Sequence, residues 1–306
     1  MQTFCPVCHA LVPCRETLVA MQLKNMRFSI VFCDRCSMAL RFPTLSSQAL
    51  AEYYSNYNLS NYHNDLEVTF RSMLPISRLR QQAILRGRGE QPRTYLEIGP
   101  GAGTLMDLFK SDGAEVIGIE PDATAAAWLE RQKGFTVINA FFEDFARSEA
   151  FDRYAGYFDV VVLSHVLEHV GHPTEFLHLI RKLVKPSSGV LYIEVPNLLK
   201  PYSDGPRWQD HCDPGHFYYY SPACLKYVVE RSGFHSVSLD DDFFPPYCPI
   251  SALFRPAGES GPAVTPVSND RQQVKTIWRT FRLLHRLFYG PVRSIAGALR
   301  NFMKAK

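Results

Sequence analysis

Three glycines close behind an apolar run are the first residues of this sequence whose types and spacing suggest chemistry. They are Gly99, Gly101 and Gly103 in the stretch YLEIGPGAGTL. A glycine turn between a strand and a helix lets the backbone approach a nucleotide-bearing cofactor at the helix N-terminus. Thr104 occupies the position of the third glycine in the dinucleotide fingerprint G-x-G-x-x-G. The loop therefore predicts a cofactor site and argues weakly against a pyrophosphate ligand.

Two glutamates flank this loop and bear on the choice of cofactor. Glu97 stands just before the turn, where its negative charge suits a cationic amino group. Glu120 ends the next apolar run, 17 positions after Gly103, where an acid can accept hydrogen bonds from both ribose hydroxyls. NAD and S-adenosylmethionine (SAM) both contain adenosine, but only SAM has an amino-acid part. Glu97 therefore favours SAM, whereas Glu120 fits either cofactor.

The elements that must position these residues alternate between short apolar runs and helical stretches from about Thr94 onward. This alternation predicts an α/β fold with a doubly wound parallel sheet. Two later runs, joined by a proline-containing connection, predict an antiparallel pair that closes the sheet. The expected strands are TYLEI, EVIGIE, FTVINA, FDVVVLS, GVLYIEV, HSVSLDD and PISALFRP.

Four of these stretches carry a family resemblance. LEIGPGAG, VIGIEPD, FDVVVLSHVLEHVGHP and GVLYIEVPN are similar, in this order, to the motifs of class I SAM-dependent methyltransferases. The resemblance covers roughly residues 94–255. It implies a Rossmann-like, seven-stranded sheet, SAM as the methyl donor and S-adenosylhomocysteine (SAH) as the product.

The same resemblance assigns roles to individual positions. Glu97 and the three glycines match the loop at the methionine side of SAM, and Glu120 matches the ribose ligand. Pro121 matches the residue that lies against adenine. The usual acid that holds the adenine amino group is replaced by Phe141, so the backbone of Phe142 and the side chain of Glu143 are the candidates there. Ser164 and His165 match the loop behind the sulfonium.

Two C-x2-C pairs near the N-terminus predict a metal site. Twenty-four residues separate the pairs, and two such knuckles fit one tetrahedral, structural Zn²⁺ better than a redox motif. The expected ligands are Cys5, Cys8, Cys33 and Cys36.

The zinc module followed by tyrosines resembles a bacterial methyltransferase subgroup associated with sugars and polysaccharides. In that subgroup, the module and the tyrosines are thought to help cover the active site. The corresponding tyrosines here are Tyr53, Tyr54, Tyr57 and Tyr62. They can equally pack at a domain seam.

Histidines are the candidate groups for taking a proton from a methyl acceptor, since imidazole titrates in the useful pH range. His216 in DHCDPGHFYYYS is the provisional base, with Asp213 or Tyr218–Tyr220 to orient it. His165 and His169 are the other candidates, and a purely structural role is open for each. We identify no acidic triad, so we expect catalysis without Mg²⁺.

The bulk properties limit the function classes. The net charge of +3 gives no strong signal for nucleic acid. The N-terminus does not read as a signal peptide, and no run reaches the roughly 20 apolar residues of a membrane span. We therefore expect a cytoplasmic protein in a reducing compartment.

The C-terminal segment is basic, with nine Lys or Arg and no acid in residues 271–306. Its amphipathic pattern predicts a helical tail. Such a tail could dock on the core, contact another subunit, or lie on the inner membrane face. Nucleic acid is a weaker alternative.

These observations divide the chain into five parts. The predicted parts are a zinc-binding module (1–45), a helical, tyrosine-rich connector (46–93), a methyltransferase domain (94–256), a linker (257–270) and the tail (271–306). The favoured function is methyl transfer from SAM to a sugar, a nucleotide-linked sugar or a related small metabolite, in glycan or glycolipid synthesis. The alternatives are an RNA or protein acceptor, or a zinc-ribbon scaffold with a non-catalytic methyltransferase-like domain.

Overall fold

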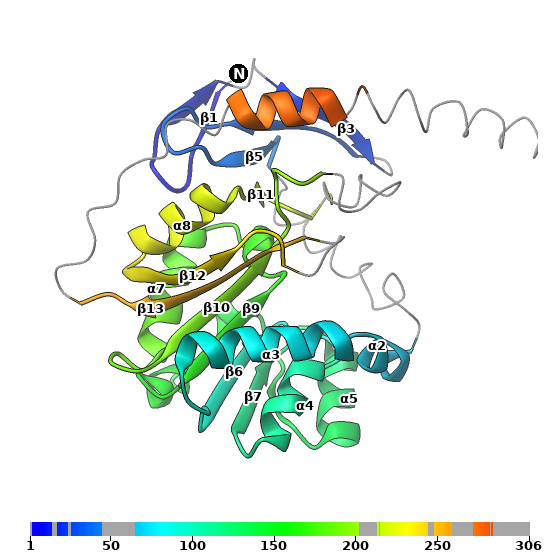
Figure 1. The fold of residues 1–306 in the computed structure, drawn as a ribbon, viewed down its shortest axis with the longest axis vertical. Coiled ribbons are helices and arrows are strands. Elements are labelled where there is room, and N and C mark those ends of the chain that lie inside the picture. Colours follow the sequence, from blue (N-terminus) through cyan, green and yellow to red (C-terminus); the bar gives the residue numbers. More distant parts are fainter. Residues whose placement is uncertain are drawn as a thin grey trace, which may run out of the picture.

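The computed structural model in Figure 1 shows a layered α/β body with a smaller β-rich unit packed at one end. The structure describes residues 2–13, 17–23, 26–44, 65–201, 213, 215–243, 248–258, 272–281 and 283. The tyrosines of the predicted connector, Tyr53 to Tyr62, lie outside the described residues, as does most of the tail.

A seven-stranded sheet forms the centre of the larger body. Its strand order is β12-β13-β10-β9-β6-β7-β8. The five strands from β10 to β8 are mutually parallel, whereas β13 is antiparallel to both of its neighbours. The α/β fold class is confirmed, including the antiparallel pair that closes the sheet. The strands are β6 (Thr94–Ile98), β7 (Glu115–Ile119), β8 (Thr136–Ile138), β9 (Val160–Ser164), β10 (Val190–Val195), β12 (Phe234–Asp240) and β13 (Ile250–Pro256).

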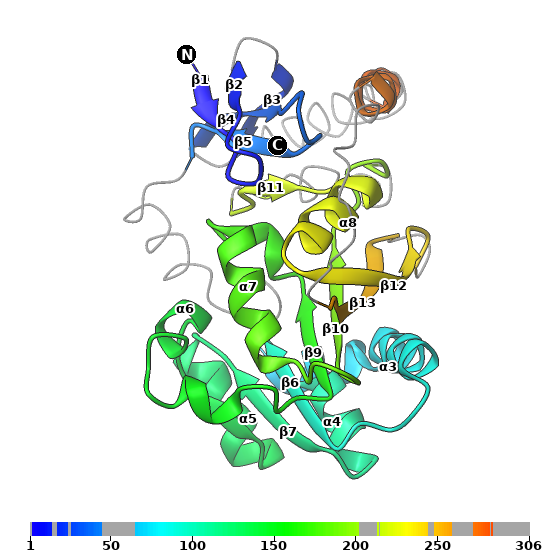
Figure 2. The ribbon, with the colours of Figure 1, turned by 90° about the vertical axis from the view of Figure 1, so that its left-hand side faces the viewer.

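Helices cover both faces of this sheet because alternate strand residues point to opposite sides. Tyr95, Val160 and Val162 pack with side chains from α3, α4 and α5 on one face. Leu96 and Val161 pack with side chains from α6, α7 and α8 on the other (Figure 2). The helices are α2 (Leu66–Ser72), α3 (Leu74–Arg88), α4 (Thr104–Ser111), α5 (Ala123–Lys133), α6 (Phe142–Phe145), α7 (Pro173–Leu183) and α8 (Pro222–Arg231), with short 3-10 turns η2 (Phe151–Tyr154) and η3 (Leu167–His169).

The helical segment before the sheet is divided into α2 and α3. Asp65 caps α2 by accepting hydrogen bonds from the backbone N–H groups of Glu67 and Val68. The chain breaks at Met73, and α3 begins with Pro75 in its first turn, where proline needs no hydrogen-bond partner for its nitrogen.

The N-terminal unit is all β. A hairpin of β1 (Gln2–Phe4) and β2 (Leu11–Pro13) lies beside a sheet containing β3 (Thr17–Leu23), β4 (Met26–Phe32) and β5 (Ala39–Phe42). The fourth strand of this sheet, β11 (Tyr218–Tyr219), comes from the larger body and pairs antiparallel with β5. The sequence did not predict that the larger body adds a strand to this sheet. The backbone hydrogen bonds between β11 and β5 connect the two units.

The described part of the C-terminal segment is helical over residues 272–281 and docks on the N-terminal sheet (Figure 1). Val274 and Trp278 are fully buried, and they pack with Phe28, Ile30 and Tyr219. The Trp278 indole donates a hydrogen bond of 2.8 Å to the backbone oxygen of Leu198. Docking on the core, one of the roles considered for the tail, is therefore what its described first turns do.

Among the described residues, none of the helices has the length and apolar character needed to cross a membrane.

Candidate methyl-transfer site

The glycine loop between β6 and α4 has the backbone conformation that its sequence predicts. Gly99, Gly101 and Gly103 all have positive φ, at 67°, 55° and 72°. A Cβ atom at Gly103 would lie 2.5 Å from Leu129 Cδ2, so only glycine fits there. A Cβ atom at Gly101 would meet nothing within 4 Å, so the protein itself leaves that position open. The open side of the loop is where a ligand can approach the backbone closely.

Glu120 lies directly after β7 and joins the glycine loop to the neighbouring strand. Its carboxylate accepts hydrogen bonds from the backbone N–H groups of Gly101 (3.2 Å) and Asp122 (2.9 Å). Burial raises the pKa of Glu120 to about 7, although these two hydrogen bonds act in the opposite direction. A ribose diol is a neutral donor pair that fits such a carboxylate.

Glu97 is buried in β6, just before the loop. Tyr95 donates a hydrogen bond of 2.8 Å to its Oε2 atom. Burial raises the pKa of Glu97 to about 7, partly offset by the Tyr95 hydrogen bond and the Arg80 charge. An ammonium group beside this carboxylate would stabilise the ionised form, because opposite charges lower a carboxyl pKa.

The region predicted to contact adenine follows β8. The Phe142 side chain is buried against Phe176, with ring centroids 4.7 Å apart, so only its backbone can face a ligand. Pro121 and Glu143 are exposed. Asn139, which the sequence reasoning missed, donates hydrogen bonds from Nδ2 to the backbone oxygens of Glu120 (2.7 Å) and Pro121 (3.2 Å). This amide fixes the loop between the two predicted ligand contacts.

His165 follows Ser164 at the end of β9 and has a left-handed backbone, with φ 56°. The loop after β9 also contacts the glycine loop, since a Cβ atom at Gly99 would lie 3.1 Å from Val166 Cγ2. The imidazole of His165 lies between two buried carboxylates: Nδ1 is 3.2 Å from Glu168 Oε1 and Nε2 is 3.1 Å from Glu194 Oε1. Burial disfavours its charge, but the two carboxylates outweigh burial and raise the pKa of His165 to about 9. His165 is therefore an imidazolium at neutral pH that donates from both nitrogens.

Behind His165, Arg80 balances the charge of Glu194 in a buried ion pair. Arg80 of α3 binds the Glu194 carboxylate with two hydrogen bonds, one of 2.9 Å from Nε and one from a terminal guanidinium nitrogen. Tyr192 donates a third hydrogen bond of 3.0 Å to Glu194. Although burial acts in the opposite direction, Arg80 and His165 hold the pKa of Glu194 well below its usual range. The sequence reasoning missed this pair, although an acid inside the apolar run GVLYIEV signals a buried charge with a partner.

His169 and His216 meet although 46 positions separate them in the chain. Their rings form an edge-to-face contact with centroids 4.7 Å apart, and His216 is buried. The phenol of Tyr218 donates to the Gly171 backbone oxygen (2.6 Å), and that of Tyr220 to the Leu167 backbone oxygen (3.4 Å). The sequence analysis offered these two tyrosines as groups that could orient His216. In the structure, their hydroxyl groups instead fix the loop after β9. His211 lies outside the described residues.

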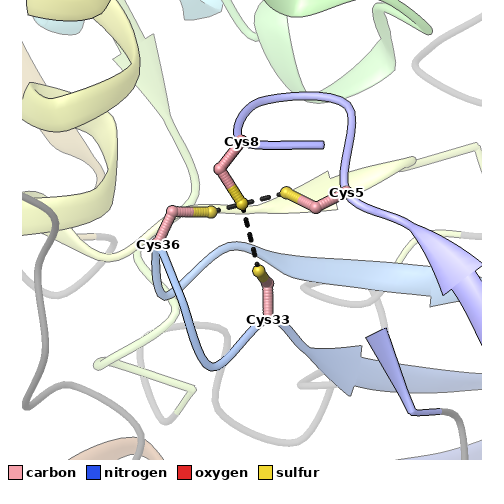
Figure 3. Close-up of side chains that lie close together, drawn as sticks. All are labelled: Cys5, Cys8, Cys33 and Cys36. Carbon is pink, nitrogen blue, oxygen red and sulfur yellow. Dashed lines mark hydrogen bonds between the residues drawn. The ribbon is translucent and has the colours of Figure 1, made fainter. Parts of the chain in front are cut away.

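The four predicted metal ligands come together in the N-terminal unit (Figure 3). The sulfur of Cys5 lies 3.4 Å from that of Cys36, and the sulfur of Cys8 lies 3.5 Å from that of Cys33. These separations are too long for disulfides and close to the roughly 3.8 Å expected between sulfurs on one tetrahedral Zn²⁺.

The two cysteine knuckles also have the same backbone. In each, the residue after the second cysteine has positive φ, His9 at 56° and Ser37 at 61°. The N–H of each donates to the carbonyl of the first cysteine, both at 2.9 Å. The four buried thiols thus fit Zn²⁺ in number, chemistry and separation.

Comparison with known proteins fixes the family. A model described as "Methyltransferase domain" matches residues 71–239, more than half of the chain. The chain belongs to this family. The enzyme class predicted from the glycine loop and the strand motifs is confirmed at this level.

Individual relatives agree with the family. The chain is 31% identical over 129 residues to a ubiquinone biosynthesis O-methyltransferase of Erwinia tasmaniensis, covering 42% of this chain and 53% of that protein. It is 32% identical over 144 residues to the protein of the same name from Vibrio campbellii, covering 45% and 59%. The match thus spans little more than half the length of these relatives.

A structural comparison supports the fold. A methyltransferase of Burkholderia thailandensis, solved with 1,6-didemethyltoxoflavin and SAH, superposes with a TM-score of 0.51 at 16% identity. The superposition covers 78% of this chain and 99% of that one.

Proposed function

We propose that this methyltransferase transfers the methyl group of SAM to a hydroxyl oxygen of a small-molecule acceptor. The observation that carries the proposal is the proximity of two kinds of group at the carboxyl ends of β6, β7 and β9. One is a glycine loop with two buried acids. The other is a group of histidines that begins directly after β9.

On the cofactor side, each predicted contact has a physical role. Glu97 accepts hydrogen bonds from the SAM amino group, Glu120 binds the ribose hydroxyls, and the glycine loop approaches the methionine part. Pro121, the Phe142 backbone and Glu143 border the adenine. Ser164 and His165 lie behind the sulfonium.

His165 lies where the cofactor and acceptor sides meet, and it supplies a fixed positive charge there. Because both of its nitrogens donate to carboxylates, it is not the group that takes a proton. A positive charge at this position would stabilise the oxygen of an acceptor as it loses its proton. His169 and His216 are the proposed groups that assist the removal of that proton.

The overall reaction balances without a further reactant. The acceptor oxygen forms a bond to the methyl carbon as the carbon–sulfur bond breaks and its electron pair moves to sulfur. One proton leaves the hydroxyl, and neutral SAH is the product. Positioning of the two reactants and desolvation of the sulfonium contribute most of the acceleration.

The relatives are named as O-methyltransferases of ubiquinone biosynthesis, and these names bear on the acceptor class. They favour a phenolic hydroxyl over the sugar hydroxyl expected from the sequence, and they give no support to a glycan, RNA or protein acceptor. The cytoplasmic location stays a prediction.

We also propose that Cys5, Cys8, Cys33 and Cys36 hold a structural Zn²⁺. With all four positions taken by thiolates, the ion would leave no site for a substrate. The ion would crosslink the two cysteine knuckles.

Isothermal titration of the full, zinc-loaded chain with SAH tests the cofactor half, with Glu97→Gln as the variant and Glu130→Gln, an exposed residue of α5, as its control. Transfer of labelled methyl from SAM to simple catechols and to nucleotide-linked sugars then tests the acceptor. We expect SAH binding that weakens at least tenfold in Glu97→Gln, and label on the catechol. Absence of SAH binding by the wild-type chain would disprove the function, and label on the sugar alone would restore the sequence-based acceptor.

A further inference from the structure

A second group of metal-binding side chains lies apart from the four cysteines. Glu168, His169 and His216 each offer a donor atom, and the three atoms lie within 4.8 Å of one another. Glu168 and His169 belong to the 3-10 turn after β9, whereas His216 precedes β11. Glu168 and His216 are buried, and His169 is half-buried.

The backbone holds these two segments in register. The N–H of Phe217 donates to the Glu168 carbonyl at 2.8 Å, next to two of the three donor side chains. On the other side of His216, Asp213 accepts from the Gly215 N–H at 2.7 Å through its side chain and from the His216 N–H at 3.0 Å through its carbonyl. The three side chains are therefore brought together by a turn that is itself fixed.

The hydrogen bond of His169 selects the nitrogen that would bind a metal. Its Nδ1 lies 3.2 Å from the Gly215 carbonyl, which can only accept, so Nδ1 carries the proton. Nε2 is then the nitrogen that can offer a lone pair to a metal. A backbone carbonyl on the second nitrogen is the usual outer partner of a metal-binding histidine.

Glu168 supplies the observation that points to a ligand. Its Oε1 atom is paired with His165, but its Oε2 atom is buried and has no hydrogen-bond partner among the described residues. The residue is 1% exposed. A buried carboxylate oxygen without a partner is costly, and a bound cation would remove that cost.

We propose that Glu168, His169 and His216 bind a divalent transition-metal ion, zinc or iron(II), rather than Mg²⁺. Two imidazoles and one carboxylate are the ligands that these ions accept, whereas Mg²⁺ prefers an all-oxygen shell. Ligand atoms on one such ion lie about 3.3 Å apart in tetrahedral geometry, so the three donor atoms, which lie within 4.8 Å of one another, would move together by up to about 1.5 Å on binding. Three protein ligands leave a coordination position open, which is typical of a catalytic rather than a structural site.

This site deepens the proposed function and rests on it for its use in catalysis. A hydroxyl oxygen of the acceptor in the open position would become more acidic, and its proton would pass to water. The oxygen then attacks the methyl carbon of SAM as described above, with the electron pair of the carbon–sulfur bond moving to sulfur. His216 thereby assists deprotonation as a metal ligand, not as the proton acceptor itself.

Metal content tests the site without knowledge of the acceptor. The full chain is stripped with a chelator, reloaded with Zn²⁺ or Co²⁺, desalted and analysed by mass spectrometry of its metals. We expect two ions per chain, one for each group of ligands. Cys33→Ser should lose the thiolate-to-cobalt absorption, whereas His216→Ala and Glu168→Gln should lose one ion and keep that absorption. The exposed His178→Ala is the control and should keep both.

A wild-type chain that holds a single ion, lost in Cys33→Ser and kept in His216→Ala, would overturn the proposal. Glu168→Gln removes little volume, so it still decides the outcome if His216→Ala does not fold. SAH titration of the same samples separates this result from the proposed function: loss of the second ion with intact SAH binding concerns the metal alone, and failure of SAH binding in the wild type concerns the function.

Discussion

The cofactor half of the site takes its main residues from a single stretch, Glu97 to Pro121, whereas the acceptor half is assembled from distant segments. The glycine loop and Glu120 belong to consecutive strands and are joined by one hydrogen bond. The histidine group combines the turn after β9 with residues just before β11, and β11 is paired to a sheet of the N-terminal unit.

The two halves of the site therefore depend on different parts of the fold. Glu97, the glycine loop and Glu120 depend on the seven-stranded sheet and the helices that cover it. The position of His216 depends also on the backbone pairing of β11 with β5 and on the zinc knuckles that hold β5. Perturbations of the N-terminal unit should therefore affect the acceptor half first.

Metal removal should have the largest effect and should separate the two halves. If the cysteines hold Zn²⁺, chelation removes a contribution of the order of 10 kcal/mol to the folding of the N-terminal unit. We expect a lower unfolding temperature and faster hydrogen exchange at Arg41, whose N–H donates to the Phe217 carbonyl. The amides of β6 should keep their protection, and SAH affinity should change less than threefold.

The control for this experiment is Cys248→Ser, a buried free cysteine outside the group of four. It should leave the chelator response unchanged. A chelated chain whose Arg41 amide exchanges as slowly as before would contradict the dependence of β11 on the metal.

Trp278→Ala should destabilise the contact between the C-terminal helix and the N-terminal sheet. The indole is fully buried and hydrogen-bonded to Leu198, so we expect a loss of about 3 kcal/mol in the free energy of unfolding. Chemical denaturation measures this, with the exposed neighbour Arg279→Ala expected to change stability by less than about 0.5 kcal/mol. Equal effects of the two variants would mean that the helix does not dock through Trp278.

Gly101→Ala should affect the cofactor half selectively. The added Cβ meets no protein atom, so its cost to folding is only the strain of the positive φ, about 1 kcal/mol. Because the backbone there is expected to approach SAM, we predict a roughly hundredfold loss of SAH affinity by titration, about 2.7 kcal/mol. Gly113→Ala is the matched control, with φ 92° and nothing within 4 Å. A similar SAH affinity in both variants would place the ligand elsewhere.

The smallest effect concerns pH. Both Glu97 and Glu120 have a pKa raised by burial to about 7, so they become protonated as the pH falls through 7. Since binding of the SAM ammonium group favours ionised Glu97, SAH affinity should fall below pH 7 by up to about tenfold per unit. Titrations between pH 6 and pH 8 measure this slope, which Glu97→Gln should flatten. An affinity independent of pH in the wild type would exclude an ionised Glu97 as the ammonium partner.

The same two acids act in the opposite direction on stability. Their folded-state pKa values lie above those of the unfolded chain, so the folded state binds more protons between pH 4.5 and 7. The free energy of unfolding from these groups therefore decreases as the pH rises through that window. A bound cofactor should offset this loss.

The cofactor half could be predicted from the sequence because its signals are local. Glycine adopts positive φ at little energetic cost, so Gly99, Gly101 and Gly103 predict the conformation of the loop. The parallel sheet follows from the alternation of apolar runs and helices, and the antiparallel closing pair from two later runs joined by a proline-containing connection. The cysteine pairs are equally local, since each knuckle closes on itself.

The acceptor half could not be predicted in the same way. Arg80 and Glu194 are 114 positions apart in the chain. Each needs the other because both are buried, and a buried charge without a partner is costly. His165 could be named as a candidate, but its charge depends on two carboxylates from different elements. The strand β11 has only two residues and no distinctive sequence pattern. Its pairing partner depends on the edge of the N-terminal sheet, β5, which lies next to it in space.

The sequence by itself determined the methyltransferase fold and the geometry of the cofactor loop, because backbone preferences and hydrophobic periodicity act over a few residues. Only the tertiary structure decided which histidines meet, which of them is charged, and that the zinc knuckles and the histidine group are connected through the pairing of β5 with β11. The physical reason is that hydrogen-bond partners, desolvation and charge pairing are set by neighbours in space, and these neighbours come from every part of the chain.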